Sequence, residues 1–307
     1  METLVAGSRG SKLALRQAEW VKERLETDGH RVEIIVIQTS GDRRPQASLI
    51  QPGSKGLFVK EIEEALARGA IDLAVHSLKD LPVDQPPGLC LAAIPPREDA
   101  RDVLVSRDHQ PLDKLVAGAR LSTSSLRRQA QLRCLRPDLQ IVPVRGNVDT
   151  RIKKMRQGEC DGLVLAAAGL RRLALDSLVT QYFRISEICP AVGQGALAIE
   201  IRQGDDRVRR AVQPLNDFQT HTAVDAERIV LRQLGGGCQT PIAVHAEVAD
   251  KLLSMSGVVA RPDGGEIIRA TAQGTIEDID GVTAQLASEL IEQGARAILQ
   301  SMSDGGV

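Results

Sequence analysis

The first two hundred residues alternate short β-branched runs with segments of helical periodicity, and this alternation constrains the fold more than any other feature of the chain. The alternation is typical of α/β architecture with parallel strands. The predicted strands are residues 4–6, 31–38, 71–75, 89–94, 103–105, 120–122, 140–144, 162–165 and 196–201, and the predicted helices are 13–26, 57–68, 126–135 and 148–157. Residues 39–56 carry prolines and glycines without periodicity, so they are predicted to form a loop.

Two segments that contain prolines or glycines, residues 95–101 and 190–196, interrupt the alternation of strands and helices. They indicate that the chain leaves a first domain, forms a second and returns to the first. We expect a first doubly wound α/β domain at residues 1–97 plus 196–216 and a second at 98–195. Residues 217–307 read differently, with a helix at 219–233, strands at 242–248, 252–260 and 266–275, a turn at 261–265 and a final helix at 282–293. This part is predicted to be a small α+β domain with an antiparallel sheet.

Composition excludes several classes of protein. Only 2% of the residues are aromatic, which argues against the stacking platforms of single-stranded nucleic-acid binders. Five cysteines without C-x-x-C spacing argue against a disulfide framework and against a zinc site, so we expect no metal. The chain has neither a signal-peptide pattern nor a run of transmembrane length, so we expect a cytoplasmic protein that does not bind membranes.

Basic residues concentrate in one stretch, although the net charge is only −1. Residues 120–156 hold ten Lys and Arg against two acids. Thr123-Ser124-Ser125 follows a predicted strand and opens a helix that carries Arg127 and Arg128, an arrangement suited to binding anions. The alternative is an ordinary Ser cap with solvated arginines.

The same arrangement recurs at other strand ends. Arg145 and Arg151 follow the next strand, and Arg9 and Ser11 follow the first strand of the chain. Arginines at strand-to-helix junctions converge on one cleft in this architecture, so we expect a polyanionic ligand there.

His76-Ser77-Leu78-Lys79-Asp80 follows an apolar strand. Asp80 is the best candidate for acid–base work or for stabilising a cation, and the alternative is an Asp that caps a loop. His76 is predicted to be a hydrogen-bonded structural residue.

Cys238 follows three successive glycines, Gly235, Gly236 and Gly237, and precedes Pro241 by three residues. Glycines permit close approach of a bulky group, so this pattern favours a Cys238 thiol that faces a cavity. The alternative is a buried thiol that packs as a small hydrophobe.

Six segments together resemble the porphobilinogen deaminase (hydroxymethylbilane synthase) family, in the family's order and across nearly the whole chain. They are Lys55-Gly-Leu-Phe-Val-Lys-Glu61, Ala74-Val-His-Ser-Leu-Lys-Asp80, Thr123-Ser-Ser-Leu-Arg-Arg128, Arg145-Gly-Asn-Val-Asp-Thr-Arg151, Ala191-Val-Gly-Gln-Gly195 and Gly235-Gly-Gly-Cys-Gln239. The resemblance implies two α/β domains like those of periplasmic binding proteins, with the third domain carrying the cysteine. The chain differs from the family's pattern at Leu121-Ser122, where the family often has a glycine, and in the loop at residues 45–53.

The resemblance also implies an activity, namely the joining of four porphobilinogen molecules into a linear tetrapyrrole with release of ammonia at each addition. The chain would grow on a dipyrromethane cofactor bound to Cys238 through a thioether, and Asp80 would stabilise the azafulvenium formed when ammonia leaves. The resemblance assigns cofactor binding to Lys79, Thr123, Ser125, Arg127, Arg128, Arg145 and Gly146, and substrate binding to Arg9, Ser11, Lys55, Ser77, Arg151 and Gln194. It implies a monomer that binds no nucleic acid.

Two other functions remain open on the residues alone. A non-enzymatic, two-lobed anion-binding protein would explain the two α/β halves and the arginines, but it would leave the third domain and Cys238 unexplained. A cysteine-nucleophile hydrolase would need a His–carboxylate partner, and the nearest histidine along the chain, His245, lies in a predicted strand.

Overall fold

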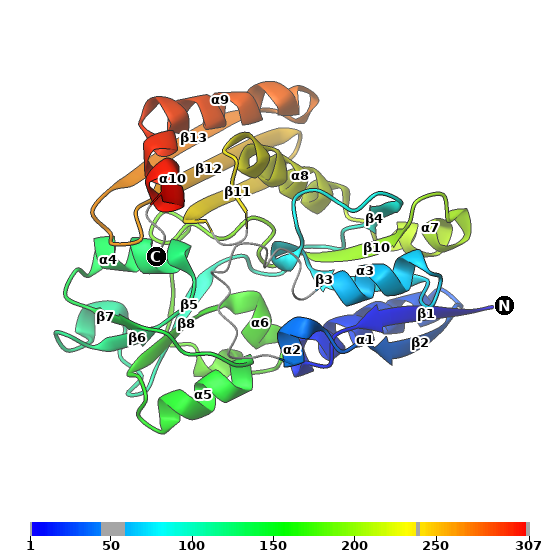
Figure 1. Ribbon diagram of the computed structural model, residues 1–307, viewed down its shortest axis with the longest axis horizontal. Helices are drawn as coiled ribbons and strands as arrows, with labels where there is room; N and C mark the ends of the chain where they lie inside the picture. The colour runs from blue at the N-terminus through cyan, green and yellow to red at the C-terminus, as the bar shows by residue number, and fades with distance from the viewer. Residues whose placement is uncertain (1, 44–58, 238–239, 305–307) are drawn as a thin grey trace. The chain divides into compact units, whose positions relative to one another are not determined.

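The structure is a computed structural model that describes residues 2–43, 59–237 and 240–304 (Figure 1). The chain forms two compact units. Unit 1 comprises Met1–Glu98 and Gly195–His221, and unit 2 comprises Asp99–Gln194 and Thr222–Val307. Unit 1 holds one sheet and unit 2 holds two.

The sheet of unit 1 is five-stranded and mixed. Its order is β2 (Arg31–Val36), β1 (Thr3–Ser8), β3 (Leu73–Ser77), β10 (Leu197–Arg202) and β4 (Leu89–Ala93). β1 runs parallel to β2 and β3, whereas β10 is antiparallel to both of its neighbours. The expectation of parallel strands is therefore wrong at β10, because the hydrophobic pattern that identifies a strand carries no information about its direction.

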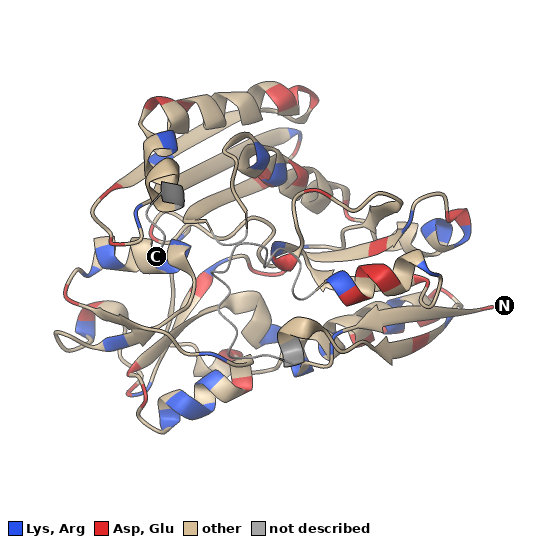
Figure 2. Cartoon of the chain, in the orientation of Figure 1, with Lys and Arg blue, Asp and Glu red and all other residues tan. Residues whose placement is uncertain are grey.

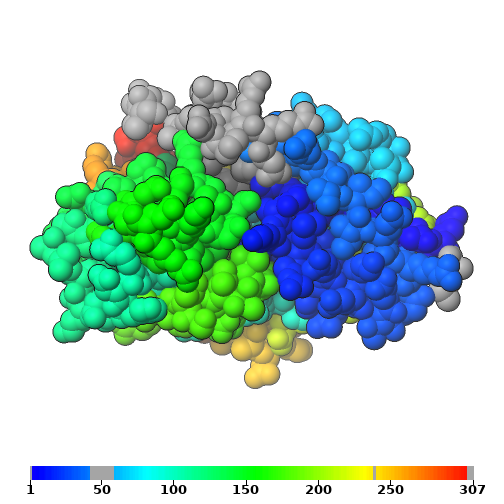
Figure 3. All heavy atoms as spheres, turned by 90° about the horizontal axis from the view of Figure 1, so that it is seen from below, coloured from blue at the N-terminus to red at the C-terminus, as the bar shows by residue number. Residues whose placement is uncertain are grey.

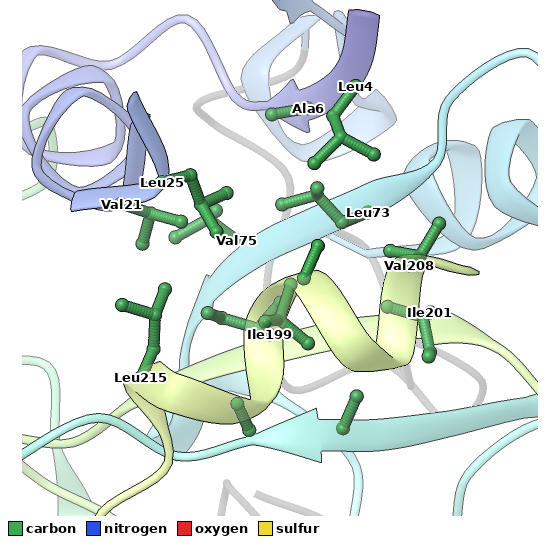
Figure 4. Packing of buried hydrophobic residues seen from close by; sticks show 14 of the residues in the cluster. Leu4, Ala6, Val21, Leu25, Leu73, Val75, Ile199, Ile201, Val208 and Leu215 are labelled. Carbon is green, nitrogen blue, oxygen red and sulfur yellow. The ribbon is translucent and has the colours of Figure 1, made fainter. Parts of the chain in front are cut away.

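Helices cover both faces of this sheet. Helix α1 (Lys12–Thr27) and helix α7 (Asp206–Val212) pack on one face, and α3 (Lys60–Ala67) packs on the other. Figure 4 shows the first of these cores, with aliphatic side chains from α1, β1, β3, β10 and α7 facing one another. Ser11 caps α1 by accepting a hydrogen bond from the Ala14 N–H at 3.2 Å. A short helix, α2 (Ser40–Arg43), lies within the predicted loop, and residues 44–58 lie outside the described ranges.

The second sheet, in unit 2, has the same strand arrangement. Its order is β7 (Gln140–Val142), β6 (Arg120–Ser122), β8 (Gly162–Ala166), β5 (Asp102–Ser106) and β9 (Gln181–Tyr182). β6 runs parallel to β7 and β8, and β5 is antiparallel to β8. In both sheets the fourth position is thus taken by the strand that follows a crossing of the chain between units.

Unit 2 also contains the antiparallel sheet predicted near the C-terminus. Strands β11 (Ile242–Ala249), β12 (Leu252–Ala260) and β13 (Ile267–Thr275) follow α8 (Phe218–Gln233), and the turn between β12 and β13 places Gly264 at φ +80°. Helix α9 (Ile279–Glu292) packs on one face of this sheet. Sequence analysis missed a further helix, α10 (Ala295–Asp304).

Helix α4 (Leu126–Leu135) joins the two sheets of unit 2. Leu132 belongs to the core of the second sheet, while Ala130 packs with Ala243 and Val258 of the third. Helices α5 (Val148–Arg156) and α6 (Ala167–Arg172) cover the other face of the second sheet. This shared helix explains why residues predicted to form two domains cluster as one unit.

The remaining short elements are single 3₁₀ turns at Leu78–Asp80, Leu112–Lys114, Asp176–Leu178, Gln213–Leu215 and Ile276–Asp278. Within the described ranges, no helix has the length and apolar character needed to cross a bilayer.

Candidate active site

In unit 1 the predicted site residues lie at one edge of the sheet. Strands β1 and β3 are parallel neighbours, so their carboxyl ends meet at the same edge. Arg9 and Ser11 follow β1, both half-buried, and Ser77, Lys79 and Asp80 end or follow β3. The structure thus brings together five of the residues that sequence analysis selected.

The end of β3 is held by specific hydrogen bonds. The Leu78 N–H donates to the Ala196 carbonyl at 3.0 Å, and the Ser77 hydroxyl exchanges hydrogen bonds with the Gln17 amide at 2.8 and 3.2 Å. Asp80 closes the 3₁₀ turn with its side chain exposed, and Lys79 is half-buried. A carboxylate is therefore presented to solvent from a well-fixed backbone.

His76, the residue before Ser77, has a partner that sequence analysis missed. Its Nε2 lies 3.2 Å from Oε2 of Glu200 on β10, and both side chains are buried. The geometry agrees with a hydrogen-bonded structural histidine. The signal for it was an acid within the apolar run of residues 196–201.

In unit 2 the predicted residues also gather at one strand edge. The carboxyl ends of β6, β7 and β8 share this edge. Asp102, the first residue of β5, lies there as well because β5 runs antiparallel to β8 and places Asp102 opposite Ala166. Ser125 caps α4 by accepting from the Arg128 N–H at 3.5 Å. The Thr123 hydroxyl accepts from the Ser125 N–H at 3.2 Å and is buried.

Arg127 and Arg128 lie in the interior rather than on a solvated basic face. They are only 4% and 7% exposed. Arg127 Nη1 donates to Asp102 Oδ2 at 2.7 Å, and Arg128 donates to Oδ1 through Nε at 3.0 Å and Nη2 at 2.7 Å. Arginine is normally solvated, so the sequence alone could not reveal a buried acid about 25 residues earlier in the chain as its partner.

The same network ties together the two segments in which the chain crosses between units. Gln194 Nε2 donates to the Ala100 carbonyl at 2.7 Å and to Asp102 Oδ1 at 2.8 Å, so Gln194 is buried rather than displayed. Arg127 Nη1 also reaches the Cys189 carbonyl at 2.5 Å, and the Cys189 N–H donates to Gln131 Oε1 at 2.8 Å. Sequence analysis missed Asp102 and Gln131.

The charges of this network favour an additional anion. Burial alone would raise the pKa of Asp102, but the charges of Arg127 and Arg128 and their hydrogen bonds outweigh it and hold that pKa well below its usual range. Burial lowers the pKa of Arg128, yet a guanidinium stays protonated. Two guanidinium groups therefore share one carboxylate, and the buried Arg127 Nε has no hydrogen-bond partner among the described residues.

Arg145, Gly146 and Arg151 form a basic corner after β7. Arg145 is exposed, and Arg151 Nε donates to the Gly146 carbonyl at 2.7 Å. Gly146 has φ +115°, and a Cβ there would lie 2.8 Å from Thr150 Cγ2, so glycine is required at this turn. Helix α5 carries further lysine and arginine residues, coloured blue in Figure 2. The bright green region to which α5 belongs lies at the surface of unit 2 (Figure 3).

Two predicted site residues, Cys238 and Lys55, lie outside the described residues. The flanks of the cysteine are described: Gly237 and Thr240 exchange backbone and hydroxyl hydrogen bonds, and a Cβ on Gly236 would lie 2.7 Å from Leu231 Cδ1. Among the described cysteines, Cys160 and Cys189 are buried and Cys90 and Cys134 are half-buried. Nowhere in the described ranges do three or more His, Cys, Asp or Glu side chains form a group that could hold a metal ion.

Fold and site together define an α/β protein with hydroxyls and arginines at the strand ends of one unit and an exposed carboxylate at those of the other. The family model described as "porphobilinogen deaminase, dipyromethane cofactor binding domain" matches residues 4–210, and the model of the porphobilinogen deaminase C-terminal domain matches residues 221–292. The chain belongs to the porphobilinogen deaminase family.

Curated relatives match over nearly their whole length. The porphobilinogen deaminase of Syntrophotalea carbinolica is 52% identical over 298 residues, covering 96% of this chain and 95% of the relative. That of Geobacillus kaustophilus is 48% identical over 303 residues, covering 98% and 97%. Among solved structures, an ABC-transporter periplasmic substrate-binding protein from Coxiella burnetii aligns with a TM-score of 0.44 and 14% identity, covering 73% of this chain and 94% of that one.

Proposed function

We propose that the protein joins four porphobilinogen molecules head to tail into hydroxymethylbilane and releases one ammonia per addition, in tetrapyrrole biosynthesis. The observation that carries this proposal is the match of both family models across the chain, together with an exposed Asp80 at the β3 end. A non-enzymatic anion-binding protein would leave this carboxylate and the C-terminal family domain without a role.

The described residues fit a polycarboxylate cofactor of the dipyrromethane type. Excess buried positive charge, the orphan Nε of Arg127, the exposed Arg145 and the hydroxyl at the N-terminus of α4 are all groups that bind carboxylates. Lys79, Thr123, Ser125, Arg127, Arg128, Arg145 and Gly146 would hold the cofactor, and Cys238 would attach it through a thioether. When bound, it supplies the primer on which the product chain is built.

Each remaining residue has a role that follows from its chemistry. Porphobilinogen carries two carboxylates, which Arg9, Ser11, Lys55, Ser77, Arg151 and Gln194 would bind and orient; Gln194, being buried, would act through the Asp102 network. Positive charge develops on the substrate as ammonia leaves. Asp80, a short carboxylate fixed at a strand end, stabilises that charge and accepts a proton at its Oδ atoms.

We further propose that the chain acts as a monomer in the cytoplasm. We also propose a division into three domains at residues 1–97 plus 196–216, 98–195 and 217–307. The separate sheets support this division, and the shared helix α4 makes the last two domains one compact unit.

The mass of the intact protein tests the central assignment. A thioether survives denaturation, so purified protein should exceed its sequence mass by two linked pyrrole units and keep this excess in denaturant. Cys238→Ser should lose the excess, because a hydroxyl is a much poorer nucleophile than a thiolate. The matched control, Cys90→Ser at a half-buried position, should retain it. An unmodified mass in protein that consumes porphobilinogen would overturn the attachment.

A further inference from the structure

A buried cluster of titratable side chains lies behind the strand end that carries Asp80. His76 is 5% exposed and Glu200 is fully buried, with His76 Nε2 and Glu200 Oε2 at 3.2 Å. Glu63 on α3 interacts electrostatically with the same pair. Burial raises the pKa of Glu63, the charge of Glu200 raises it further, and His76 lowers it. His76 and Glu200 are the structural pair described above, and none of the three residues has been given a catalytic or binding role.

The cluster is unusual in its unsatisfied oxygens. Among the described residues, Oε1 of Glu200 and Oε1 of Glu63 are buried without a hydrogen-bond partner. Buried polar atoms normally find partners, because leaving one unpaired costs stability. Replacing a buried ion pair with apolar residues of similar volume is often neutral or stabilising, so stability alone does not account for the polar groups.

The location of the cluster suggests what it contributes. His76 lies opposite Ala198 in the β3–β10 register, one residue before Ser77 and four before Asp80. Ser77 is tied to Gln17 on α1, and Leu78 N–H is tied to the Ala196 carbonyl. The bond between His76 and Glu200 adds a side-chain link to these bonds and to the β3–β10 ladder, and it is directional where apolar packing is not.

We propose that His76 and Glu200 are positioning residues for Asp80: their hydrogen bond fixes the carboxyl end of β3 against β10 and so fixes the turn that presents the Asp80 carboxylate. This inference rests on the role proposed for Asp80. Groups that act on a reacting centre need to be held within about 0.5 Å.

Five variants, one of them a control, separate positioning from stability. His76→Leu and Glu200→Leu each leave a buried polar partner unsatisfied and are expected to lower thermal stability. The double variant His76→Leu/Glu200→Leu removes both groups and should recover most of that stability. Glu200→Gln keeps an acceptor for His76. Val75→Ala is the matched control, since it destabilises the same strand through its apolar core side and leaves the hydrogen bond in place.

The measurements are kcat and KM for porphobilinogen consumption, thermal unfolding, and intact mass. The double variant should unfold near the wild-type temperature and carry the covalent adduct, yet show a kcat lowered about 10- to 100-fold with KM little changed. Glu200→Gln should have a kcat close to that of the wild type and above that of Glu200→Leu, and Val75→Ala should keep the wild-type kcat.

A double variant with wild-type kcat, or a Glu200→Gln variant as slow as Glu200→Leu, would overturn the positioning role while leaving the proposed function intact. A wild-type protein that consumes no porphobilinogen would overturn the proposed function and this inference with it.

Discussion

Removing the Asp102 carboxylate should destabilise unit 2 selectively. In Asp102→Ala, the bonds from Arg127, Arg128 and Gln194 to this side chain are lost. Two guanidinium groups then stay buried without their counter-charge. Breaking a buried ion pair by deleting one partner costs about 3–5 kcal/mol of unfolding free energy.

This loss should appear as a large shift in thermal midpoint. For a unit of this size, one kcal/mol moves the midpoint by roughly 2–4 °C, so we expect a decrease of about 6–20 °C. The contribution depends on pH in a defined direction. Because the pKa of Asp102 is depressed in the folded state, its stabilisation is present above the ordinary Asp value of about 3.9 and is lost as pH falls below it. The wild-type and variant proteins should therefore differ most between about pH 5 and 8 and converge in acid.

The two units can be followed separately. Trp20, the single tryptophan, reports on unit 1 by fluorescence, and hydrogen exchange at β5 and β8 reports on unit 2. Asp102→Ala should reduce exchange protection and leave the Trp20 transition nearly unchanged. The control is Asp138→Ala, which removes an exposed carboxylate that Arg136 contacts at 2.8 Å and should have a much smaller effect. Equal loss in the two variants would refute the argument from burial.

Three further outcomes are expected. Asp80→Asn should keep the covalent adduct in intact-mass measurements but reduce ammonia release by orders of magnitude, and near-normal turnover would remove Asp80 from the chemistry. Arg145→Leu should lower kcat/KM by the equivalent of about 1.5–3 kcal/mol without a change in unfolding temperature, whereas Arg127→Leu should lower the unfolding temperature as well; the reverse pattern would contradict their observed exposure. Burial raises the pKa of Cys189 to about 12, so iodoacetamide at pH 8 should label it only after unfolding, and labelling of the folded protein would show that the site opens.

Local signals in the sequence were sufficient for much of the fold. A Ser cap on the helix at 126–135 was the alternative to an anion site, and Ser125 does accept the capping hydrogen bond of α4, as Ser11 does for α1. Apolar runs located every described strand except β9, which is only two residues long. Helices α2, α6, α7 and α10 were missed. Helices α2, α6 and α7 are only four, six and seven residues long, and α10 begins just beyond residue 293, where the last predicted helix ended.

Long-range information was what the sequence lacked. The direction of β5 and β10 depends on where the chain returns from, and the burial of Arg127 depends on Asp102 lying beside it in space. For Arg145 and Asp80, exposure at a strand end follows from the strand pattern itself, and those two predictions of position needed no distant partner.

The place of β10 in the first sheet has a consequence for the order of events during synthesis. Strand β10 lies between β3 and β4 and pairs with both. The first 98 residues therefore contain the other four strands of that sheet but lack the strand that joins β3 to β4. A nascent chain must be extended by roughly a hundred residues more before β10 is made, a wait of about 5–20 s at ordinary translation rates. During that interval, the edges of β3 and β4 that pair with β10 in the finished sheet lack their partner strand. A ribosome-bound chain halted near residue 190 should therefore recruit chaperones and be cut readily by protease in its N-terminal part, and one halted beyond residue 221 and clear of the exit tunnel should resist both.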